Sequence, residues 1–433
     1  MTGRSRIAIL SVIIVTLSIV AAFLIANSTT TTSTTTTTTT RTGTLRLPRV
    51  PWEGGPAYWD QFPVAKAAGW NKPSFFPIAI WYDSVSSNAE VRADKSYGIN
   101  TYIGESPSTN YQLFANNDTF VLSALNNAPV GGTAQPGLFL IDEPDGRTTS
   151  ANDLANIRRL VKSSPSNGRF KEINFSATVI SDSDPEANRA NFEAMVNSYA
   201  GPVSVDKYYY SQPSCSDIRY IIVPIDPSHC RTASSYGTTV RSLRARVAAG
   251  GKLKPVWNFV EDLSGAPDPY HFTAYIQPGQ LKGAVMDSII NEARGIIYFN
   301  QSFAGTCTEG NVLRQVQTGS LPCAQPQMDA MKEVNQQIRA LAPVINTQSY
   351  RYSFGKNLDT MLKIHQGHAY IFAMISGDAT SQPGNRTFTL PPGLAGATSI
   401  QVLNENHTIR VVNGKFTDNF AHEYTCHIYK VAM

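Results

Sequence analysis

Two glutamates in this sequence each follow a short apolar run. Glu143 comes after the run 138–141 and Asp142, and Glu261 comes after the largely apolar run 255–260. If both runs are parallel β-strands, the two carboxyl groups reach the same end of the sheet, where the strands' carboxyl ends meet. Paired carboxyl groups in one cleft can hydrolyse glycosidic bonds, because one donates a proton to the leaving oxygen while the other attacks the anomeric carbon.

Eight runs in the middle of the chain have the composition of buried strands. They are 75–82, 98–105, 120–127, 137–142, 173–180, 203–210, 254–261 and 294–300. Most are continuously apolar rather than alternating, as a parallel strand covered on both faces requires. Segments with helical periodicity lie between or after them, at 150–163, 184–199, 235–249, 281–293 and 327–341. The connection 128–136 is too short for a helix.

This strand–helix rhythm predicts an α/β fold, a (β/α)8 TIM barrel over residues 47–345. Eight strands with crossovers in roughly 230 residues match the size of such a barrel. An open doubly wound sheet is the alternative, but it requires a glycine-rich phosphate loop after the first strand, and residues 82–88 contain no glycine. Short alternating runs broken by Gly-Asp, Pro-Gly and Asn-Gly turns then predict a small antiparallel β-sandwich over 346–433.

Acidic residues stand at several of the predicted strand ends, where a barrel carries its reactive groups. Asp83 ends the first strand and Glu105 the second, in addition to Glu143 and Glu261. Asp206 lies within the sixth predicted strand. We therefore expect the site among these residues, with Glu143 and Glu261 as the catalytic pair.

The pattern resembles the clan A, or 4/7, glycoside hydrolases. In that clan the acid/base glutamate ends strand four and the nucleophile ends strand seven, so the resemblance, over about residues 75–345, implies that Glu143 is the acid/base and Glu261 the nucleophile of a retaining enzyme. The Asp-Glu-Pro stretch around Glu143 is similar to the Asn-Glu-Pro of many members, with Asp142 in place of the asparagine. The longer Asp-Glu-Pro-Asp motif is similar to poorly characterised exported bacterial hydrolase-like proteins.

Further residues are candidates for substrate binding. They are Asp142, Glu105, Tyr208, Trp257, Asn258 and Trp81. By the resemblance, Tyr208 would hold the nucleophile carboxylate as a sixth-strand tyrosine does in the clan; the alternative is plain packing. For Glu143 itself the alternative is a carboxylate that stabilises a helix N-terminus.

The aromatic and polar candidates have structural alternatives as well. Trp81 and Trp257 would stack on sugar rings, although a tryptophan in a strand is more often a core residue. Glu105 and Asn258 would hydrogen-bond sugar hydroxyls or be satisfied strand-end polar groups. Three more tryptophans precede the first strand, and they either line the cleft or cap the other end of the barrel: Trp52, Trp59 and Trp70.

Other hydrolytic chemistries lack their residues. The sequence has no Gly-x-Ser-x-Gly motif, and five of its seven histidines follow residue 346, far along the chain from the predicted barrel. It also has no His-x-x-x-His or Cys-x-x-Cys spacing. We therefore expect no metal and no organic cofactor.

The first 27 residues combine a basic start with an uncharged apolar run long enough to cross a bilayer. They predict an uncleaved signal anchor with the membrane as a partner, or else a cleaved signal peptide; Leu24 is a poor residue three positions before a cut after Ala26. Residues 28–46 form a threonine-rich linker. Both alternatives place the remaining chain outside the cytoplasm, either membrane-anchored or secreted.

The cysteines are consistent with export. Cys215 and Cys230 are 15 residues apart and Cys307 and Cys323 are 16 apart, each pair in a polar, loop-rich stretch. Such pairs predict two disulfides, which persist in oxidising compartments. Cys426 remains as an unpaired thiol.

Composition excludes some functions. The 433 residues are 42% hydrophobic and 16% charged, with a net charge of +4 and no run of Lys or Arg, so a nucleic-acid partner is disfavoured. We expect a hydrolase that cleaves O-glycosidic bonds of a polysaccharide or oligosaccharide. The alternatives are a non-catalytic carbohydrate-binding or cell-surface adhesion protein on the same barrel, and a lyase or esterase, which requires a Tyr, Lys or His base in the cleft.

Overall fold

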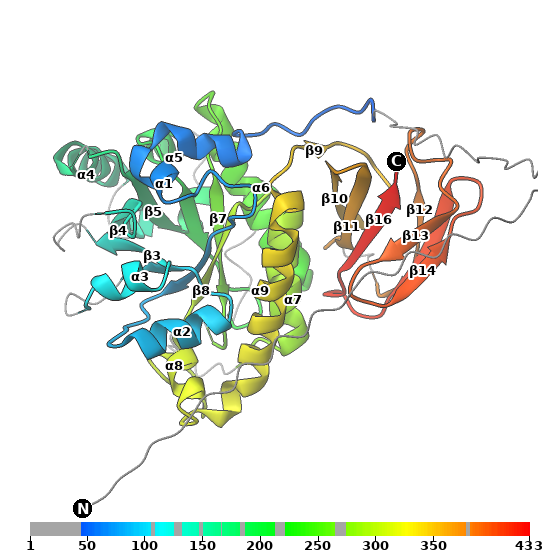
Figure 1. Ribbon diagram of the computed structural model, residues 1–433. Helices are drawn as coiled ribbons and strands as arrows, with labels where there is room; N and C mark the ends of the chain where they lie inside the picture. The colour runs from blue at the N-terminus through cyan, green and yellow to red at the C-terminus, as the bar shows by residue number, and fades with distance from the viewer. Residues whose placement is uncertain are drawn as a thin grey trace, which may run out of the picture. The chain divides into compact units, whose positions relative to one another are not determined.

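Eight parallel strands close into a barrel in which each strand pairs with the next along the chain and β8 pairs with β1 (Figure 1). The computed structural model describes residues 45–104, 109–124, 132–146, 150–165, 167–181, 187–212, 221–264, 274–377 and 382–433. The barrel strands are β1 Ile78–Trp81, β2 Thr101–Ile103, β3 Phe120–Ala124, β4 Gly137–Asp142, β5 Phe170–Ser176, β6 Val203–Asp206, β7 Val256–Glu261 and β8 Gly295–Phe299. The predicted barrel fold is confirmed.

Helices precede the first strand, lie between the strands and follow the last one. They are α1 Pro63–Ala67, α2 Asn88–Ser96, α3 Gln112–Asn116, α4 Ser150–Ser163, α5 Ala187–Asn197, α6 Ala233–Ala249, α7 Pro278–Ile290, α8 Val312–Gln317 and α9 Gln325–Ile345. Each helix expected from periodicity is present. Of the connection between β3 and β4, residues 132–136 are not helical, and residues 125–131 lie outside the described part of the chain.

Alternation along the barrel strands decides which side chains fill the barrel. In β7, Trp257 and Phe259 belong to an aromatic cluster in the barrel interior, whereas Val256 and Val260 belong to the cluster that the surrounding helices share. Successive side chains of a strand point to opposite faces. Glu261, the last residue of β7, therefore points to the same face as Trp257 and Phe259, which is the barrel interior.

Aromatic rings fill the barrel at its amino-terminal end. The Trp70 ring lies 5.0 Å from that of Phe170, the first residue of β5, and 6.1 Å from that of Trp257 near the start of β7. Trp59, in a short 3-10 helix before α1, lies 4.9 Å from Trp70. Of the two alternatives for these tryptophans, lining the cleft or capping the other end of the barrel, Trp59 and Trp70 therefore show the second.

Two antiparallel sheets follow α9 and confirm the predicted C-terminal sandwich class. Their strands are β9 Ser349–Tyr350, β10 Leu358–His365, β11 His368–Ile375, β12 Gly384–Thr389, β13 Ser399–Val402, β14 His407–Arg410, β15 Lys415–Phe420 and β16 His427–Ala432. One sheet has the order β14-β13-β16-β11-β10-β9, and β12 pairs with β15 in the other (Figure 1). A core that includes Phe388, Phe416 and Tyr429 lies among them.

Two details of this region differ from the sequence prediction. Residues 352–354 form no strand, although Tyr352 and Phe354 alternate with a polar residue as in one of the short alternating runs. Strand β15 was not predicted, because its outward positions are the polar Lys415, Thr417 and Asn419 and only every other residue or so is apolar. The strand follows the Asn413–Gly414 turn, where both residues have the positive φ of a hairpin turn.

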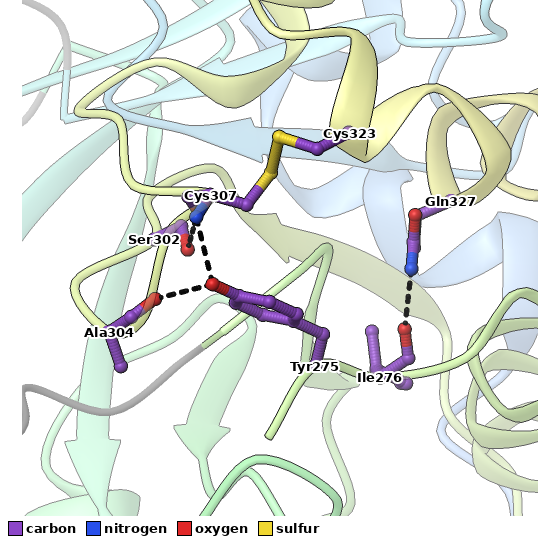
Figure 2. The surroundings of a disulfide bond; sticks show 7 residues. All are labelled: Tyr275, Ile276, Ser302, Ala304, Cys307, Cys323 and Gln327. Atoms are coloured by element: carbon purple, nitrogen blue, oxygen red, sulfur yellow. Dashed lines mark hydrogen bonds between the residues drawn. A yellow bond between two sulfur atoms is a disulfide. The ribbon is translucent and has the colours of Figure 1, made fainter. Parts of the chain in front are cut away.

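The disulfide between Cys307 and Cys323 forms as predicted, in the segment after β8 (Figure 2). Tyr275 supports it, because the Cys307 amide donates to the Tyr275 hydroxyl at 2.9 Å, which itself donates to the Ala304 carbonyl at 2.9 Å. Cys230 is also disulfide-bonded, and its predicted partner Cys215 lies outside the described residues.

The predicted signal segment 1–27 lies outside the described residues, as does the linker up to residue 44. Within the described ranges, no helix is both long and apolar enough to span a bilayer.

Truncation of the barrel cap tests the packing account. Trp70→Ala should lower the free energy of unfolding by about 3–5 kcal/mol, because it removes a large fully buried ring and leaves a cavity. Val412→Ala, at a side chain that is 54% exposed, is the matched control and should change it by less than about 0.5 kcal/mol. Denaturant unfolding measures both, and equal small losses would contradict the packing described.

Candidate active site

A cleft of about 570 Å³ opens at the carboxyl ends of the barrel strands. It is lined by residues at the ends of β1, β4, β5, β6 and β8, among them Trp81, Tyr82, Asp142, Glu143, Ser176, Asp206, Lys207, Tyr208, Phe299 and Phe303. The structure therefore brings Glu143 together with three of the other predicted residues, Asp142, Tyr208 and Trp81.

Glu143 is held in a strained backbone conformation at the end of β4. Its φ of +44° lies in the left-handed region that residues with a side chain rarely adopt. Strand β5 imposes this turn, because the Glu143 amide donates to the Asn174 carbonyl at 2.8 Å and the Asn174 amide group donates to Asp142 at 3.0 Å. A strained residue that its surroundings fix in this way is typical of functional sites.

Asp145, the last residue of the Asp-Glu-Pro-Asp motif, fixes the same turn through hydrogen bonds from the end of β5 and the residues after it. Its carboxylate accepts hydrogen bonds from the amide and hydroxyl of Ser176, at 2.9 and 3.0 Å, and from the amide of Val179 at 2.7 Å. Burial raises the pKa of Asp145 to about 7 against the opposing effect of these donors. Asp145 is thus a positioning residue for Glu143.

Asp206, at the end of β6, lies against Glu143. The two carboxyl groups are close enough for a hydrogen bond once one of them carries a proton. Burial, and then the charges of Glu143 and Asp142, raise the pKa of Asp206 well above its usual value. The charged form of Asp206 is therefore disfavoured in the cleft. Sequence reasoning noted Asp206 within its strand but did not select it, because only the parity of β6 shows that it faces the interior.

Glu261 is buried and does not line the cleft. Its side chain has no exposed surface, and it is absent from the cleft lining. The Tyr236 hydroxyl contacts both carboxylate oxygens, at 2.8 and 2.7 Å, and the amide and hydroxyl of Ser211 donate to one of them at 3.2 Å. Burial raises the pKa of Glu261 to about 7.

The tyrosine that holds Glu261 is Tyr236, in the first turn of α6, and sequence reasoning missed it. Tyr208, which was expected in that role, lines the cleft instead, and its buried hydroxyl has no hydrogen-bond partner within the described residues. Burial, and then the charges of Asp206 and Glu261, raise the pKa of Tyr208 well above its usual value. Its hydroxyl therefore keeps its proton and is available as a donor to a ligand.

Of the other predicted binding residues, two do not line the cleft and one lies outside the described residues. Trp257 is buried in the barrel interior beside Trp70 and does not reach the cleft, which is the core alternative for this residue. Asn258 has outward parity and donates to Ser288 of α7 at 2.9 Å. Glu105 lies outside the described residues.

Aromatic rings at the cleft opening were not predicted from the sequence. Tyr82 and Phe303 are 47% and 46% exposed, and Phe299 lies between Phe303 and Tyr208, with ring centroids 5.9 and 5.1 Å away. Tyr82 has a φ of +54°, and its ring covers Gly104, where a Cβ atom would lie only 2.9 Å from it. The only sequence signal was an aromatic residue next to a strand end.

In the described ranges, no group of three or more His, Cys, Asp and Glu side chains is arranged to hold a metal ion.

No family model matches the chain, and no curated protein sequence matches it. Solved structures that resemble it include AbfB, a family 51 α-L-arabinofuranosidase from Bifidobacterium longum, with 10% identity, a TM-score of 0.47 and coverage of 83% of this chain and 96% of that chain. A GH30 endoxylanase from Clostridium papyrosolvens C71 has 10% identity, a TM-score of 0.43 and coverage of 83% and 97%. α-L-Fucosidase isoenzyme 1 from Paenibacillus thiaminolyticus has 11% identity, a TM-score of 0.40 and coverage of 87% and 99%. These values identify no family for the chain.

The burial of Glu261 predicts a pH dependence of stability. Its pKa rises from 4.5 to about 7 on folding, so its contribution to stability is complete below about pH 4.5 and is lost as the pH rises through 7. Over that interval, wild type should lose about 3 kcal/mol relative to Glu261→Gln. Denaturant unfolding at several pH values measures the difference.

The matched control for this experiment is Glu333→Gln on α9, whose side chain forms an exposed ion pair with Lys282 of α7. It should follow the pH dependence of wild type. If Glu261→Gln also follows wild type, Glu261 is not buried as described.

Proposed function

We propose that the chain hydrolyses O-glycosidic bonds of a polysaccharide or oligosaccharide in this cleft. One observation carries the proposal: Glu143, fixed in a strained turn at the end of β4, lies against Asp206 in a cleft with exposed aromatic rings at its opening. A carboxyl pair supplies the proton that a leaving sugar oxygen requires. The flat apolar faces of Tyr82 and Phe303 suit the apolar faces of sugar rings.

In the proposed reaction, Glu143 donates the proton of the carboxyl pair to the glycosidic oxygen as the bond from that oxygen to the anomeric carbon breaks and a carboxylate oxygen of Glu261 bonds to that carbon. The leaving sugar departs with that proton as an alcohol. The Tyr208 hydroxyl can donate to the substrate. Glu143 then takes a proton from the incoming water, whose oxygen bonds to the anomeric carbon as the bond to Glu261 breaks, and release of the sugar restores the starting state.

We retain Glu261 as the proposed nucleophile of a retaining double displacement. Attack on the anomeric carbon requires that substrate binding uncover it, because its side chain has no exposed surface in the structure. Its bonds to Tyr236 and Ser211 favour the charged form, which is the form that attacks.

The burial of Glu261 also favours a second candidate, a carbohydrate-binding protein without turnover. A carboxylate that stays covered cannot reach a substrate in the cleft, whereas binding requires only the aromatic rings and the polar groups around them. The two candidates share a ligand class and differ in whether a bond is broken.

The charges of the cleft suggest the kind of sugar. Of the described residues that line the cleft, Asp142, Glu143 and Asp206 carry carboxyl groups and Lys207 carries an ammonium group. Complementarity of charge disfavours acidic sugars such as uronates. We therefore propose an uncharged saccharide.

We also propose that the protein acts outside the cytoplasm, membrane-anchored or secreted. The Cys307–Cys323 disulfide supports this location, since disulfides persist in oxidising compartments. The apolar run within residues 1–27 supports it from the sequence.

The direct test is a hydrolysis assay of the full chain on neutral and acidic polysaccharides and aryl glycosides. Wild type should release sugar from neutral substrates, and Glu143→Gln should be slower by about 10²–10⁴-fold, because it removes the proton donor and preserves the shape. Glu261→Gln should be comparably slow if it is the nucleophile.

The control variant Glu333→Gln should retain wild-type rates. Binding without turnover by wild type and all variants would support the carbohydrate-binding candidate instead. Full activity of Glu143→Gln would contradict the assignment of the proton donor.

A further inference from the structure

Glu423, in the connection between β15 and β16 of the C-terminal region, contacts the barrel close to the candidate site. One of its carboxylate oxygens accepts from the Tyr210 hydroxyl at 2.7 Å, and the other accepts from the Ala233 amide at 2.9 Å. Tyr210 follows β6, and Ala233 is the first residue of α6. A single side chain therefore joins both ends of the loop between β6 and α6.

The contact with Ala233 replaces a local cap. The first amide groups of a helix have no partner within it, and the residue before the helix usually provides a side-chain acceptor. Thr232 takes that position in α6, but its side chain makes no capping hydrogen bond, and the first turn contains no acidic residue. Glu423 supplies the missing acceptor together with the negative charge that a helix N-terminus favours.

The same helical turn carries Tyr236, the residue that holds Glu261. The Tyr236 hydroxyl donates to Glu261 and accepts from the amides of Tyr209 and Tyr210 at 2.9 and 3.3 Å. The Tyr210 and Tyr236 rings stack at 5.6 Å. Glu423 is thus connected to Tyr236, and through Tyr236 to Glu261, in two ways: through the ring of Tyr210 and through the first turn of α6.

A second carboxylate of the C-terminal region strengthens this connection. Asp359, in β10, accepts from the hydroxyl of Ser234 at 2.6 Å, one position after Ala233, and from Arg241 at 3.2 Å. The first turn of α6 is therefore fixed by two acidic side chains from outside the barrel.

We infer that Glu423 is a positioning residue for the candidate site, and that the C-terminal sheets fix Tyr210, the first turn of α6 and, through Tyr236, the carboxylate of Glu261. This inference rests on the proposed function as far as catalysis is concerned. It assigns to the C-terminal region a role in the geometry of the site, in addition to its own packing.

The test compares Glu423→Gln with Tyr210→Phe and with a matched control, Glu405→Gln. Glu405 is also a C-terminal carboxylate in a hydrogen bond, to His427 at 2.6 Å, but its partner belongs to the same sheet region. Glutamine at 423 keeps the shape and can accept only one of the two hydrogen bonds. If the chain hydrolyses glycosides, Glu423→Gln should lower kcat by about 10- to 100-fold with little change in KM, because the site residues shift while the cleft remains.

A second readout does not depend on activity. Infrared difference titration of the full chain follows the Glu261 carboxyl band, identified by its loss in Glu261→Gln. Hydrogen bonds from Tyr236 and Ser211 lower the pKa of Glu261, and the charge of Glu261 in turn raises the pKa values of Tyr208, Tyr210, Tyr236 and Asp262. In Glu423→Gln the Tyr236 bond loosens, so the midpoint should move upward, whereas Glu405→Gln should keep the wild-type midpoint.

Each result decides one question. A Glu261 midpoint that moves in Glu423→Gln and, to a smaller degree, in Tyr210→Phe supports the inference even if wild type hydrolyses nothing, in which case the proposed function fails alone. An unchanged midpoint in a folded Glu423→Gln protein overturns the inference whatever the activity. A midpoint that moves equally in Glu405→Gln also overturns it, because the effect would then be general destabilisation.

Discussion

Several carboxyl groups at the carboxyl end of the barrel are buried among other side chains, so their charges are poorly solvated. Burial is the largest influence on Asp145, Asp206 and Glu261, and it raises the pKa of each one. A protonated carboxyl group thereby becomes available at neutral pH, where an exposed aspartate would be ionised. The acid chemistry proposed for the cleft follows from this desolvation.

Buried carboxylates in turn require donors, and these donors organise the site. Ser176 and Val179 satisfy Asp145, Asn174 satisfies Asp142, and Tyr236 and Ser211 satisfy Glu261. Each hydrogen bond joins neighbouring parts of the barrel, so the polar contacts that offset burial also fix the turn that carries Glu143. The strain at this residue persists because several strands determine its position together.

The sequence predicted the barrel well because its strands are continuous apolar runs and its helices have a clear period. It also placed Glu143 at the cleft, since this residue follows the end of a strand, where a barrel carries its loops. It could not give the depth of Glu261, which depends on Tyr236, because the periodicity of α6 does not show that this tyrosine reaches the end of β7. Nor could it select Asp206, because its facing depends on the register of β6, or the polar strand β15, whose pairing with β12 is a tertiary contact.

In the proposed mechanism, a saccharide bound in the cleft meets a proton donor at Glu143 and a nucleophile that binding uncovers. The most direct measurement is the structure of the Glu143→Gln protein with a bound oligosaccharide. We expect a glycosidic oxygen within hydrogen-bonding distance of residue 143, and the Glu261 carboxylate about 3–3.5 Å from the anomeric carbon. An oligosaccharide in the cleft with Glu261 still covered by its present partners would contradict the displacement mechanism and identify a binding site without turnover.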